Sequence, residues 1–322
     1  MPKFRVLLTD YAWPDVEIER DVLAKVDAEL IVAPHQDVGT LTQLAADVDA
    51  IMTCWASTTA AVIAAAKNCR IVARMGIGLD NIDVEYCTQQ RIPVTNVPDY
   101  CVAEVAEHAL ALIFALARNV AFYHHETSNG RYDLQAGPVP RRIAGQTLGI
   151  IGLGNIGGCL ASKAAGLGLH VIAATRTPRS GFADVPIVEL DELLPQSDFV
   201  SLHLPLDSPT RHFISAERLS RMKRTAFLVN TARGGLVDHV ALSAALKAGQ
   251  LAGAALDVQD PEPPDLDQPP YNDPRVLVTP HAAFLSTESL VQLRRRSAGQ
   301  VAARLTGGIP ENVVNPRALN PS

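Results

Sequence analysis

Three ionisable residues stand just beyond apolar runs in the second half of the chain. Arg233 follows "AFLVNTA", Glu262 lies in "ALDVQDPEPP", and His281 follows "VLVTP". In open parallel α/β sheets, ligands bind outside the carboxyl ends of the strands. One histidine at a strand end is more often structural, but three ionisable groups at one sheet edge favour a catalytic site. We therefore expect Arg233, Glu262 and His281 to converge.

These residue types suit the reduction of a carbonyl by hydride transfer. Histidine titrates near neutrality, so His281 can deliver the proton that the resulting alkoxide requires. A neighbouring carboxylate, Glu262, favours the imidazolium form. Arg233 can hold a substrate carboxylate with two parallel hydrogen bonds and polarise the adjacent carbonyl. Asp257 is a candidate contact on the nicotinamide side of a cofactor; alternatively, it only caps the end of its strand.

A glycine-rich turn, "GIIGLGNIGG", precedes this constellation in the chain. Its spacing is G-x-G-x-x-G, between an apolar strand and the start of a helix. The first glycine permits a tight turn, the second admits a pyrophosphate, and the third lets helix and strand pack closely. The helix N-terminus then faces the phosphates. We expect a dinucleotide to contact Gly152, Gly154, Asn155, Ile156 and Gly157.

The strand after the glycine turn ends without the usual acidic residue. About 20 residues beyond such a turn, an Asp or Glu commonly binds the adenine ribose, but this chain has Thr175 and Arg176 in "IAATRTPR". The absence of a carboxylate removes repulsion of a 2′-phosphate, which Arg176 and Arg179 would attract and Thr177 would hydrogen-bond. We expect NADP(H) to be preferred, with NAD(H) possible. In the alternative interpretation both arginines are solvated surface charges.

Alternating β-rich and helical segments must position these residues. Apolar strands separated by helices indicate parallel sheets. The expected strands are 4–9, 28–33, 48–55, 69–75 and 92–97 in a first series, and 147–152, 170–175, 198–204, 226–231, 252–258 and 275–280 in a second. Between the series we expect one uninterrupted helix over 101–127. The Pro- and Asp-rich segment 259–274 is expected to be a loop.

The pattern predicts an α/β protein with two Rossmann/flavodoxin-like, doubly wound parallel-sheet domains separated by a cleft. A length of 322 residues fits two domains, and 48% hydrophobic residues supply two cores. Residues 99–290 form the expected dinucleotide-binding domain. The helical segment 286–308 has no strand beside it, so we expect it to return to the first domain. Residues 1–98 plus 291–322 are thus the expected substrate-binding domain.

Composition excludes several classes of partner. The net charge of −6 offers no basic face for nucleic acid. Five cysteines without a C-x-x-C pair, and not clustered with histidines, argue against metal and disulfide frameworks. The chain shows no signal-peptide pattern and no apolar run of about 20 residues, so no membrane association is expected. These features indicate a cytoplasmic protein.

Several motifs in order resemble the D-isomer-specific 2-hydroxyacid dehydrogenases: "ARMGIGLDNIDVEYC", "GIIGLGNIG", "NTARGGLVD", "ALDV" with "PEPP", and "TPHAA". The resemblance implies Arg233, Glu262 and His281 as the catalytic set. It also implies homodimers and two domains that close over a cleft. The substrate carboxylate would meet the backbone of Gly76, Ile77 and Gly78. The implied cofactor contacts further include Val102, Leu204, Pro205, Thr231 and Ala232.

The sequence does not indicate which side chain the substrate carries. Trp55 and Tyr100 stand where a side-chain pocket can be built, although Trp55 is equally compatible with the core. We expect an NAD(P)-dependent enzyme that reduces a small 2-oxoacid to its D-2-hydroxyacid or catalyses the reverse reaction. Two alternatives remain: a dinucleotide-sensing interaction protein similar to the C-terminal-binding-protein corepressors, and a dehydrogenase of phosphite or formate.

Overall fold

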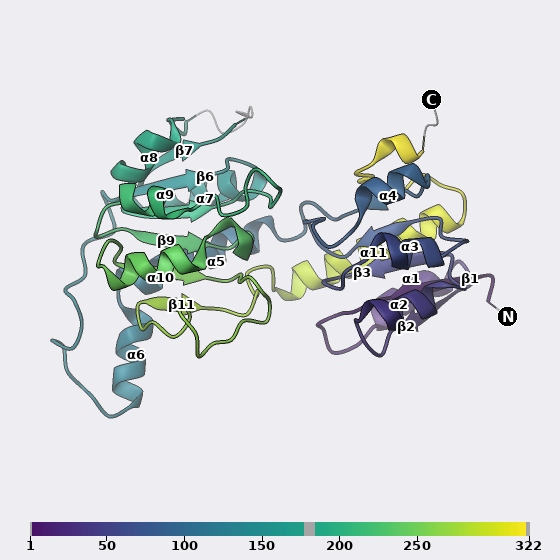
Figure 1. Ribbon diagram of the computed structural model, residues 1–322, viewed down its shortest axis with the longest axis horizontal. Coiled ribbons are helices and arrows are strands. Elements are labelled where there is room, and N and C mark those ends of the chain that lie inside the picture. The colour runs from purple at the N-terminus through teal and green to yellow at the C-terminus, as the bar shows by residue number, and fades with distance from the viewer. Residues whose placement is uncertain (1, 177–183, 320–322) are drawn as a thin grey trace. The chain divides into compact units, whose positions relative to one another are not determined.

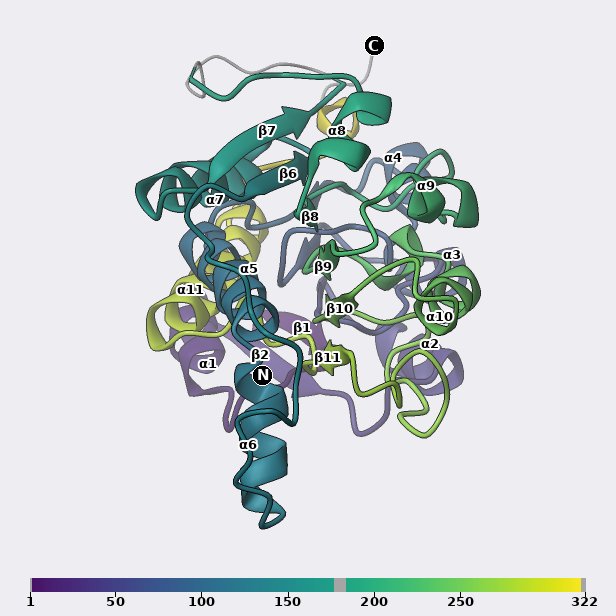
Figure 2. The same ribbon diagram turned by 90° about the vertical axis from the view of Figure 1, so that its left-hand side faces the viewer.

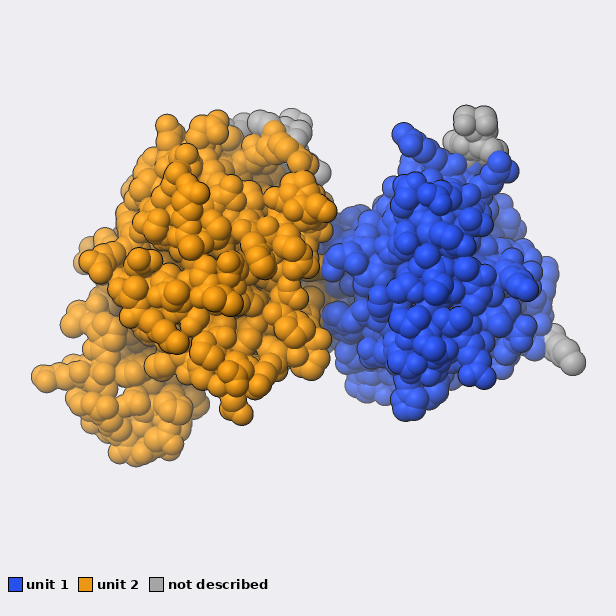
Figure 3. All heavy atoms as spheres, viewed as in Figure 1, with its two compact units in different colours: residues 1–100, 286–322 blue, residues 101–285 orange. Residues whose placement is uncertain are grey.

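The computed structural model describes residues 2–176 and 184–319. The chain divides into two compact units, coloured separately in Figure 3. Unit 1 comprises Met1–Tyr100 together with Ser286–Ser322, and unit 2 comprises Cys101–Leu285. Both ends of the chain therefore build unit 1, whereas unit 2 is one continuous segment.

Unit 1 is built on a parallel sheet with the strand order β2-β1-β3-β4-β5 (Figure 1). This is the flavodoxin-like order of doubly wound folds. Its strands are β1 (Phe4–Leu8), β2 (Ala28–Val32), β3 (Ala50–Thr53), β4 (Val72–Arg74) and β5 (Val94–Thr95). Its helices are α1 (Glu17–Ala24), α2 (Val38–Ala45), α3 (Ala60–Ala65), α4 (Val84–Gln89), α11 (Thr287–Leu305) and the short η2 (Pro316–Ala318).

The C-terminal helix α11 packs on α1 and beside β3 and β4. Ser286 and Ser289 form a capping box that satisfies the first amides of this helix. On its inner side, the buried Arg294 donates to both carboxylate oxygens of Glu19, which is also buried. A buried charge of each sign is thereby paired, so this contact fixes α11 against α1.

Unit 2 holds a six-stranded parallel sheet with the order β11-β10-β9-β8-β6-β7. An isolated parallel bridge between Ala173 and Ile187 adds one more pairing at this end of the sheet, beside β7. Counted with this bridge, the sheet contains the Rossmann order, in which the first strand lies between the second and the fourth. The strands are β6 (Thr147–Ile151), β7 (His170–Ala174), β8 (Phe199–Leu202), β9 (Phe227–Asn230), β10 (Gly253–Leu256) and β11 (Val276–Val278).

The predicted uninterrupted helix over 101–127 is wrong. The structure has α5 (Val102–Ala117) and α6 (Val120–Ser128), bent by 63° at the break between them. Asn119 adopts a left-handed conformation with φ of 54° and thereby ends the regular hydrogen bonding. Asparagine tolerates this conformation better than most residues, which the helical period of the sequence does not reveal.

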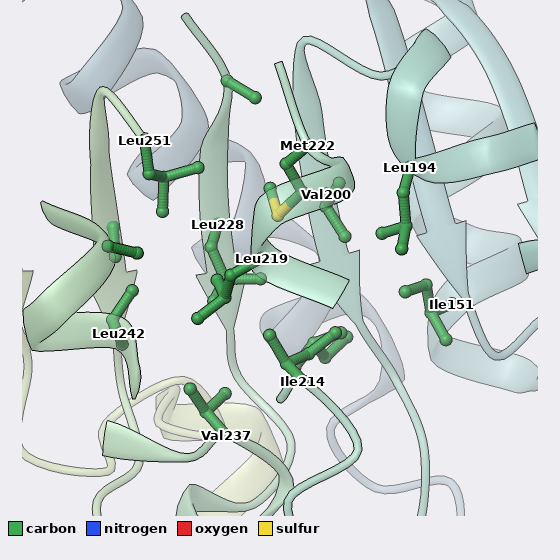
Figure 4. Packing of buried hydrophobic residues seen from close by; sticks show 14 of the residues in the cluster. Ile151, Leu194, Val200, Ile214, Leu219, Met222, Leu228, Val237, Leu242 and Leu251 are labelled. Carbon is green, nitrogen blue, oxygen red and sulfur yellow. The ribbon is translucent and has the colours of Figure 1, made fainter. Parts of the chain in front are cut away.

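Helices cover both faces of the unit 2 sheet (Figure 2). Successive strand residues point to opposite faces, so Ile150 packs on the side of α5 and α7, whereas Ile151 packs on the side of α8, α9 and α10. Figure 4 shows the second of these cores, in which Leu194 and Leu219 pack against strand residues. The remaining helices are α7 (Asn155–Gly166), α8 (Leu190–Gln196), α9 (Ala216–Arg221), η1 (Gly234–Leu236) and α10 (His239–Lys247).

Candidate active site

The glycine turn of unit 2 leaves β6 at the carboxyl edge of its sheet. Gly152 has φ of 99°, and a Cβ there would overlap the carbonyl oxygen of His203. A Cβ at Gly157 would overlap the carbonyl oxygen of Gly152. At Gly154, by contrast, a Cβ would meet no atom within 4 Å. The first and third glycines are therefore required by packing, and the second faces open space, which fits the approach of a pyrophosphate.

The residues around this turn suit a dinucleotide. Asn155 and Ile156 open α7 directly after its N-cap residue Gly154, where the first amides of a helix have no partner within the helix. Leu204, after β8, lies 3.1 Å from the position that a Gly152 Cβ would take. Pro205 follows it and accepts a hydrogen bond from Thr210 through its carbonyl oxygen. Val102 is the first residue of α5.

The end of β7 is joined to the glycine turn by a hydrogen bond. The amide of Gly152 donates to the carbonyl of Ala174 over 2.9 Å. Thr175, half-buried, and Arg176, exposed, follow immediately. The predicted partners Thr177 and Arg179 lie outside the described residues. The adenine-ribose side of the predicted cofactor site therefore carries a hydroxyl and a guanidinium in its described part.

The loop after β9 carries Thr231, Ala232 and Arg233 and is held by Asn230. The fully buried Asn230 side chain accepts from the Ala232 amide over 3.0 Å and donates to the Arg233 carbonyl over 2.8 Å. Arg233 Nη1 also donates to the Ala232 carbonyl over 2.7 Å. Thr231 is buried, and within the described ranges its hydroxyl has no hydrogen-bond partner. Asn230 was missed by sequence reasoning; its signal is a polar residue ending an apolar strand.

A close backbone contact brings the Arg233 loop to the Glu262 loop. A Cβ at Gly234 would overlap the backbone of Gln259 and lie 2.7 Å from the Asp260 nitrogen. Only glycine allows this approach. The Gln259 amide in turn donates to Glu262 Oε1 over 2.8 Å. Direct contacts through Gln259 therefore connect the Arg233 loop to the carboxylate of Glu262.

Glu262 and His281 form a pair, with His281 Nδ1 lying 2.8 Å from Glu262 Oε2. Burial raises the pKa of Glu262, but the hydrogen bond and charge of His281, the Gln259 amide and the Arg233 charge together hold this pKa below its ordinary value. An ionised carboxylate only accepts, so Nδ1 carries the hydrogen in this pair. Nε2 is therefore the ring nitrogen of His281 that can take part in proton transfer to a substrate.

Asp257 organises the loop that carries His281. It is fully buried, and its carboxylate accepts from the amides of Ala282 and Ala283 over 2.8 and 2.9 Å and from the Thr279 hydroxyl over 2.6 Å. His108 Nε2, from α5, lies 3.1 Å from the Thr279 hydroxyl. These contacts correspond to the strand-cap alternative, and the nicotinamide contact of Asp257 stays a prediction. Sequence reasoning missed His108 and Thr279.

Apart from Arg233, which belongs to unit 2, the predicted substrate-binding residues lie in unit 1. Gly76, Ile77 and Gly78 form the loop after β4. Trp55 follows β3, is half-buried, and donates its amide to Asp10 Oδ2 over 2.6 Å. Tyr100 is buried. All but Tyr100 thus follow the carboxyl ends of neighbouring strands, where open α/β sheets bind ligands.

Residues 2–176 and 184–319 contain neither an arranged metal-ligand cluster nor a single membrane-spanning helix. No group of three or more histidine, cysteine, aspartate or glutamate side chains in these ranges is arranged to hold a metal ion. No single helix there combines the length and apolar composition needed to cross a membrane. The bent pair of α5 and α6 meets these criteria only when its two helices are counted together.

A Rossmann-type sheet with this glycine turn, and a histidine–carboxylate pair at the same sheet edge, together define a dinucleotide-dependent oxidoreductase. The family model for the NAD-binding domain of D-isomer-specific 2-hydroxyacid dehydrogenases matches residues 110–283. A glyoxylate reductase from Korarchaeum cryptofilum is 42% identical over 262 residues, which cover 80% of this chain and 79% of the relative. The chain therefore belongs to the D-isomer-specific 2-hydroxyacid dehydrogenases.

Solved structures extend the similarity over nearly the whole chain. A D-lactate dehydrogenase from Aquifex aeolicus, in complex with NAD and lactic acid, has a TM-score of 0.87 at 27% identity and covers 99% of this chain and 100% of its own. An NADPH-dependent glyoxylate/hydroxypyruvate reductase from Sinorhizobium meliloti, in complex with NADP and malonate, has a TM-score of 0.87 at 27% identity and covers 98% of each chain.

These similarities confirm the predicted fold class and activity class. The chain is a nicotinamide-dinucleotide-dependent oxidoreductase that transfers a hydride between the cofactor and a 2-oxoacid or, in reverse, its D-2-hydroxyacid. The corepressor-like interaction protein and the phosphite or formate dehydrogenase receive no support from them.

Proposed function

We propose that this enzyme prefers NADPH and reduces glyoxylate, hydroxypyruvate or a similarly small 2-oxoacid. The observation that carries the cofactor preference is the pair Thr175 and Arg176 at the end of β7, hydrogen-bonded to the glycine turn through Ala174. No carboxylate there repels a 2′-phosphate, and a guanidinium attracts it. The Korarchaeum and Sinorhizobium relatives, which are named for glyoxylate and hydroxypyruvate, support the substrate size.

The catalytic residues have separate tasks in this proposal. The nicotinamide supplies the hydride when bound. His281 Nε2 gives its proton to the carbonyl oxygen as negative charge develops there, and takes it back in the reverse direction. Glu262, held ionised, orients the ring through Nδ1 and stabilises the imidazolium. Arg233 polarises the carbonyl and binds the substrate carboxylate, with its backbone fixed by Asn230.

The proposal is tested by steady-state kinetics with both cofactors and a panel of acids. The panel contains glyoxylate, hydroxypyruvate, pyruvate, phenylpyruvate and a branched 2-oxoacid. We expect kcat/KM with NADPH to exceed that with NADH by roughly tenfold or more, since one charge-assisted hydrogen bond to phosphate contributes about this much. Glyoxylate and hydroxypyruvate should be the best substrates. An NADH preference of similar size contradicts the cofactor assignment, and a preference for phenylpyruvate contradicts the substrate size.

We propose that the protein forms homodimers through α6 and the segment after it. Helix α6 has no buried residue, and Figure 2 shows it standing away from the unit 2 sheet. Tyr132, Leu134 and Val139 beyond it are 95%, 87% and 91% exposed. Exposed apolar side chains so close in sequence favour a protein interface. Sedimentation of the wild type and a Tyr132→Asp/Leu134→Asp variant tests this: a wild-type monomer, or a variant that stays dimeric, contradicts it.

We also propose a cytoplasmic location. Cys54, Cys69, Cys87 and Cys159 form no disulfide in the structure, and Cys54 and Cys87 are buried. Unpaired thiols are typical of reducing compartments. Fractionation of the native host tests this location, and recovery of the protein from the extracytoplasmic fraction contradicts it.

A further inference from the structure

A buried arginine, Arg74, holds the loop around Gly76, Ile77 and Gly78 through hydrogen bonds to its carbonyl groups. Arg74, the last residue of β4, is 7% exposed. Its Nε donates to the Gly78 carbonyl over 2.9 Å, and its Nη1 donates to the Met75 carbonyl. A Cβ at Gly76 would lie 2.6 to 2.9 Å from the guanidinium atoms. The Arg74 side chain thus folds back and lies against the loop that directly follows β4.

The other two carbonyl groups of this loop are also held. The Gly76 carbonyl accepts from the Val97 amide over 3.0 Å, and the Ile77 carbonyl accepts from Asn96 Nδ2 over 2.8 Å. Asn96 is itself buried, and its carbonyl accepts from Gln300 Nε2 on α11. Four successive carbonyl groups, from Met75 to Gly78, are therefore turned toward donors of unit 1.

The direction of the carbonyls fixes the direction of the amides. In a trans peptide the N–H points opposite to the C=O of the same unit, and none of these four peptide bonds is cis. The N–H groups of Gly76, Ile77, Gly78 and Leu79 therefore point away from Arg74 and the Asn96–Val97 segment. None of the four donates a hydrogen bond within the described part of the chain. Successive backbone amides without an internal acceptor are the donors from which protein anion sites are built.

Arg74 adds a charge to this arrangement. Its guanidinium donates to two carbonyl oxygens and also contacts the buried Cys54 thiol, and no described carboxylate forms an ion pair with it. A buried cation without a paired anion is costly unless its field serves an anion nearby. The field of Arg74 favours a negative charge at the loop, which is where the 2-oxoacid carboxylate is expected.

We propose that Arg74 and Asn96 are positioning residues for substrate binding: they hold the carbonyls of the 75–78 loop so that its amides stay directed at the carboxylate of the 2-oxoacid. This inference rests on the proposed function and deepens it. Arg74 acts through the loop backbone and its field, not by touching the substrate. Lysine has one donor head in place of the planar fork, so it cannot hold both carbonyls in the same way.

The test compares Arg74→Lys and Asn96→Asp with the wild type. We expect KM for the 2-oxoacid to rise by roughly tenfold or more, because about 1.4 kcal/mol of binding is a factor of ten. The kcat and the Kd for NADPH should stay close to wild type. Binding of oxamate, a 2-oxoacid analogue, to the enzyme saturated with NADPH should weaken by the same factor. Arg70→Lys is the matched control, since Arg70 precedes the same strand and its side chain is 49% exposed.

The outcomes separate this inference from the proposed function. A wild type that reduces no 2-oxoacid with either cofactor overturns the function. An active wild type whose Arg74→Lys variant keeps its KM and its oxamate affinity overturns the positioning role alone. Equal losses of NADPH binding and substrate binding also overturn it, because they indicate general damage. If Arg74→Lys does not fold, Asn96→Asp decides by the same criteria.

Discussion

Each unit has a glycine-containing loop that leaves a parallel strand at its carboxyl end, yet the two loops present their amides in different ways. In unit 2, the turn from Gly152 to Gly157 runs straight into α7, a helix of 12 residues. In unit 1, the loop from Gly76 to Gly78 is followed by α4, which has six residues and begins only at Val84. The first loop has a helix N-terminus behind it, and the second does not.

The difference shows two ways to orient backbone donors toward an anion. A helix aligns its first amides through its own hydrogen bonding and adds the field of its dipole. Without a helix, the same result needs donors from outside the loop, here the guanidinium of Arg74 and the amide of Asn96. The helix-backed loop therefore depends on its glycines alone, whereas the other loop also depends on the side chains of Arg74 and Asn96. The glycine variants below test the first loop, and the Arg74 and Asn96 variants described above test the second.

The largest effect is expected from His281→Ala in unit 2. Removing the proton donor should lower kcat by about 10³-fold, within the range found for general acids, while the Kd for NADPH stays unchanged. Stopped-flow turnover and fluorescence titration of NADPH measure the two quantities. His170→Ala, on the exposed start of β7, is the control and should keep full activity. A loss of kcat below tenfold would remove His281 from the acid role.

Alanine substitutions in the glycine turn should separate packing from ligand contact. Gly157→Ala places a Cβ onto the Gly152 carbonyl, so both the melting temperature and NADPH affinity should fall, the affinity by roughly a hundredfold. Gly154→Ala has room in the protein and should lose NADPH affinity with an unchanged melting temperature. Calorimetry and fluorescence titration measure both.

The matched control lies in the same helix. A Cβ at Gly166 meets no atom within 4 Å, so Gly166→Ala should leave NADPH affinity unchanged and not lower the melting temperature. If Gly154→Ala binds NADPH normally, the open space at this glycine does not receive the pyrophosphate, and the comparison of the two loops fails.

Arg176→Ala should change cofactor choice and little else. We expect kcat/KM with NADPH to fall by roughly tenfold to a hundredfold and kcat/KM with NADH to stay near its wild-type value. Steady-state kinetics with both cofactors at one fixed 2-oxoacid concentration measure this. Arg295→Ala, an exposed arginine on α11, controls for the loss of one positive charge. Equal losses with both cofactors would contradict this prediction, because they would indicate that Arg176 stabilises the fold and does not bind the 2′-phosphate.

The smallest effect concerns the pH dependence of stability. Because the folded pKa of Glu262 is lowered, its stabilising contribution is fully present above the ordinary value of 4.5 and is lost as pH falls through the lower folded pKa. The melting temperature of the wild type should exceed that of Glu262→Gln at pH 7, and the gap should shrink below pH 4.5. Asp267→Asn, exposed in the same loop, should show no such gap. A gap that widens toward acid pH contradicts the assignment.

Patterns local in sequence predict much of this molecule. The runs "TLGII" and "FLVN" are strands because apolar β-formers favour a sheet covered on both faces, and residues placed at their ends do reach the sheet edge. The pairing of Glu262 with His281 could be expected because both follow neighbouring strands. The break at Asn119 could not, since one left-handed residue is enough to end a helix.

Contacts with partners distant in sequence could not be predicted, even for Asp257, which the sequence marked as a candidate cofactor contact or strand cap. Asp257 accepts from amides 25 and 26 positions further along, a contact that no local period encodes. Arg74 ends an apolar strand, and its sequence does not show whether the side chain turns into solvent or under its own loop. Its signal was a charged residue inside "CRIVARM", where an apolar one would continue the run.

The bridge beside β7 shows how the end of this strand is kept in place. Ala173 donates to the Pro186 carbonyl and accepts from the Val188 amide, both over 2.9 Å, so the chain that leaves β7 is fastened again to the strand it left. The end of β7, from which Thr175 and Arg176 follow, is thereby held along both of its edges, by β6 on one side and by this bridge on the other.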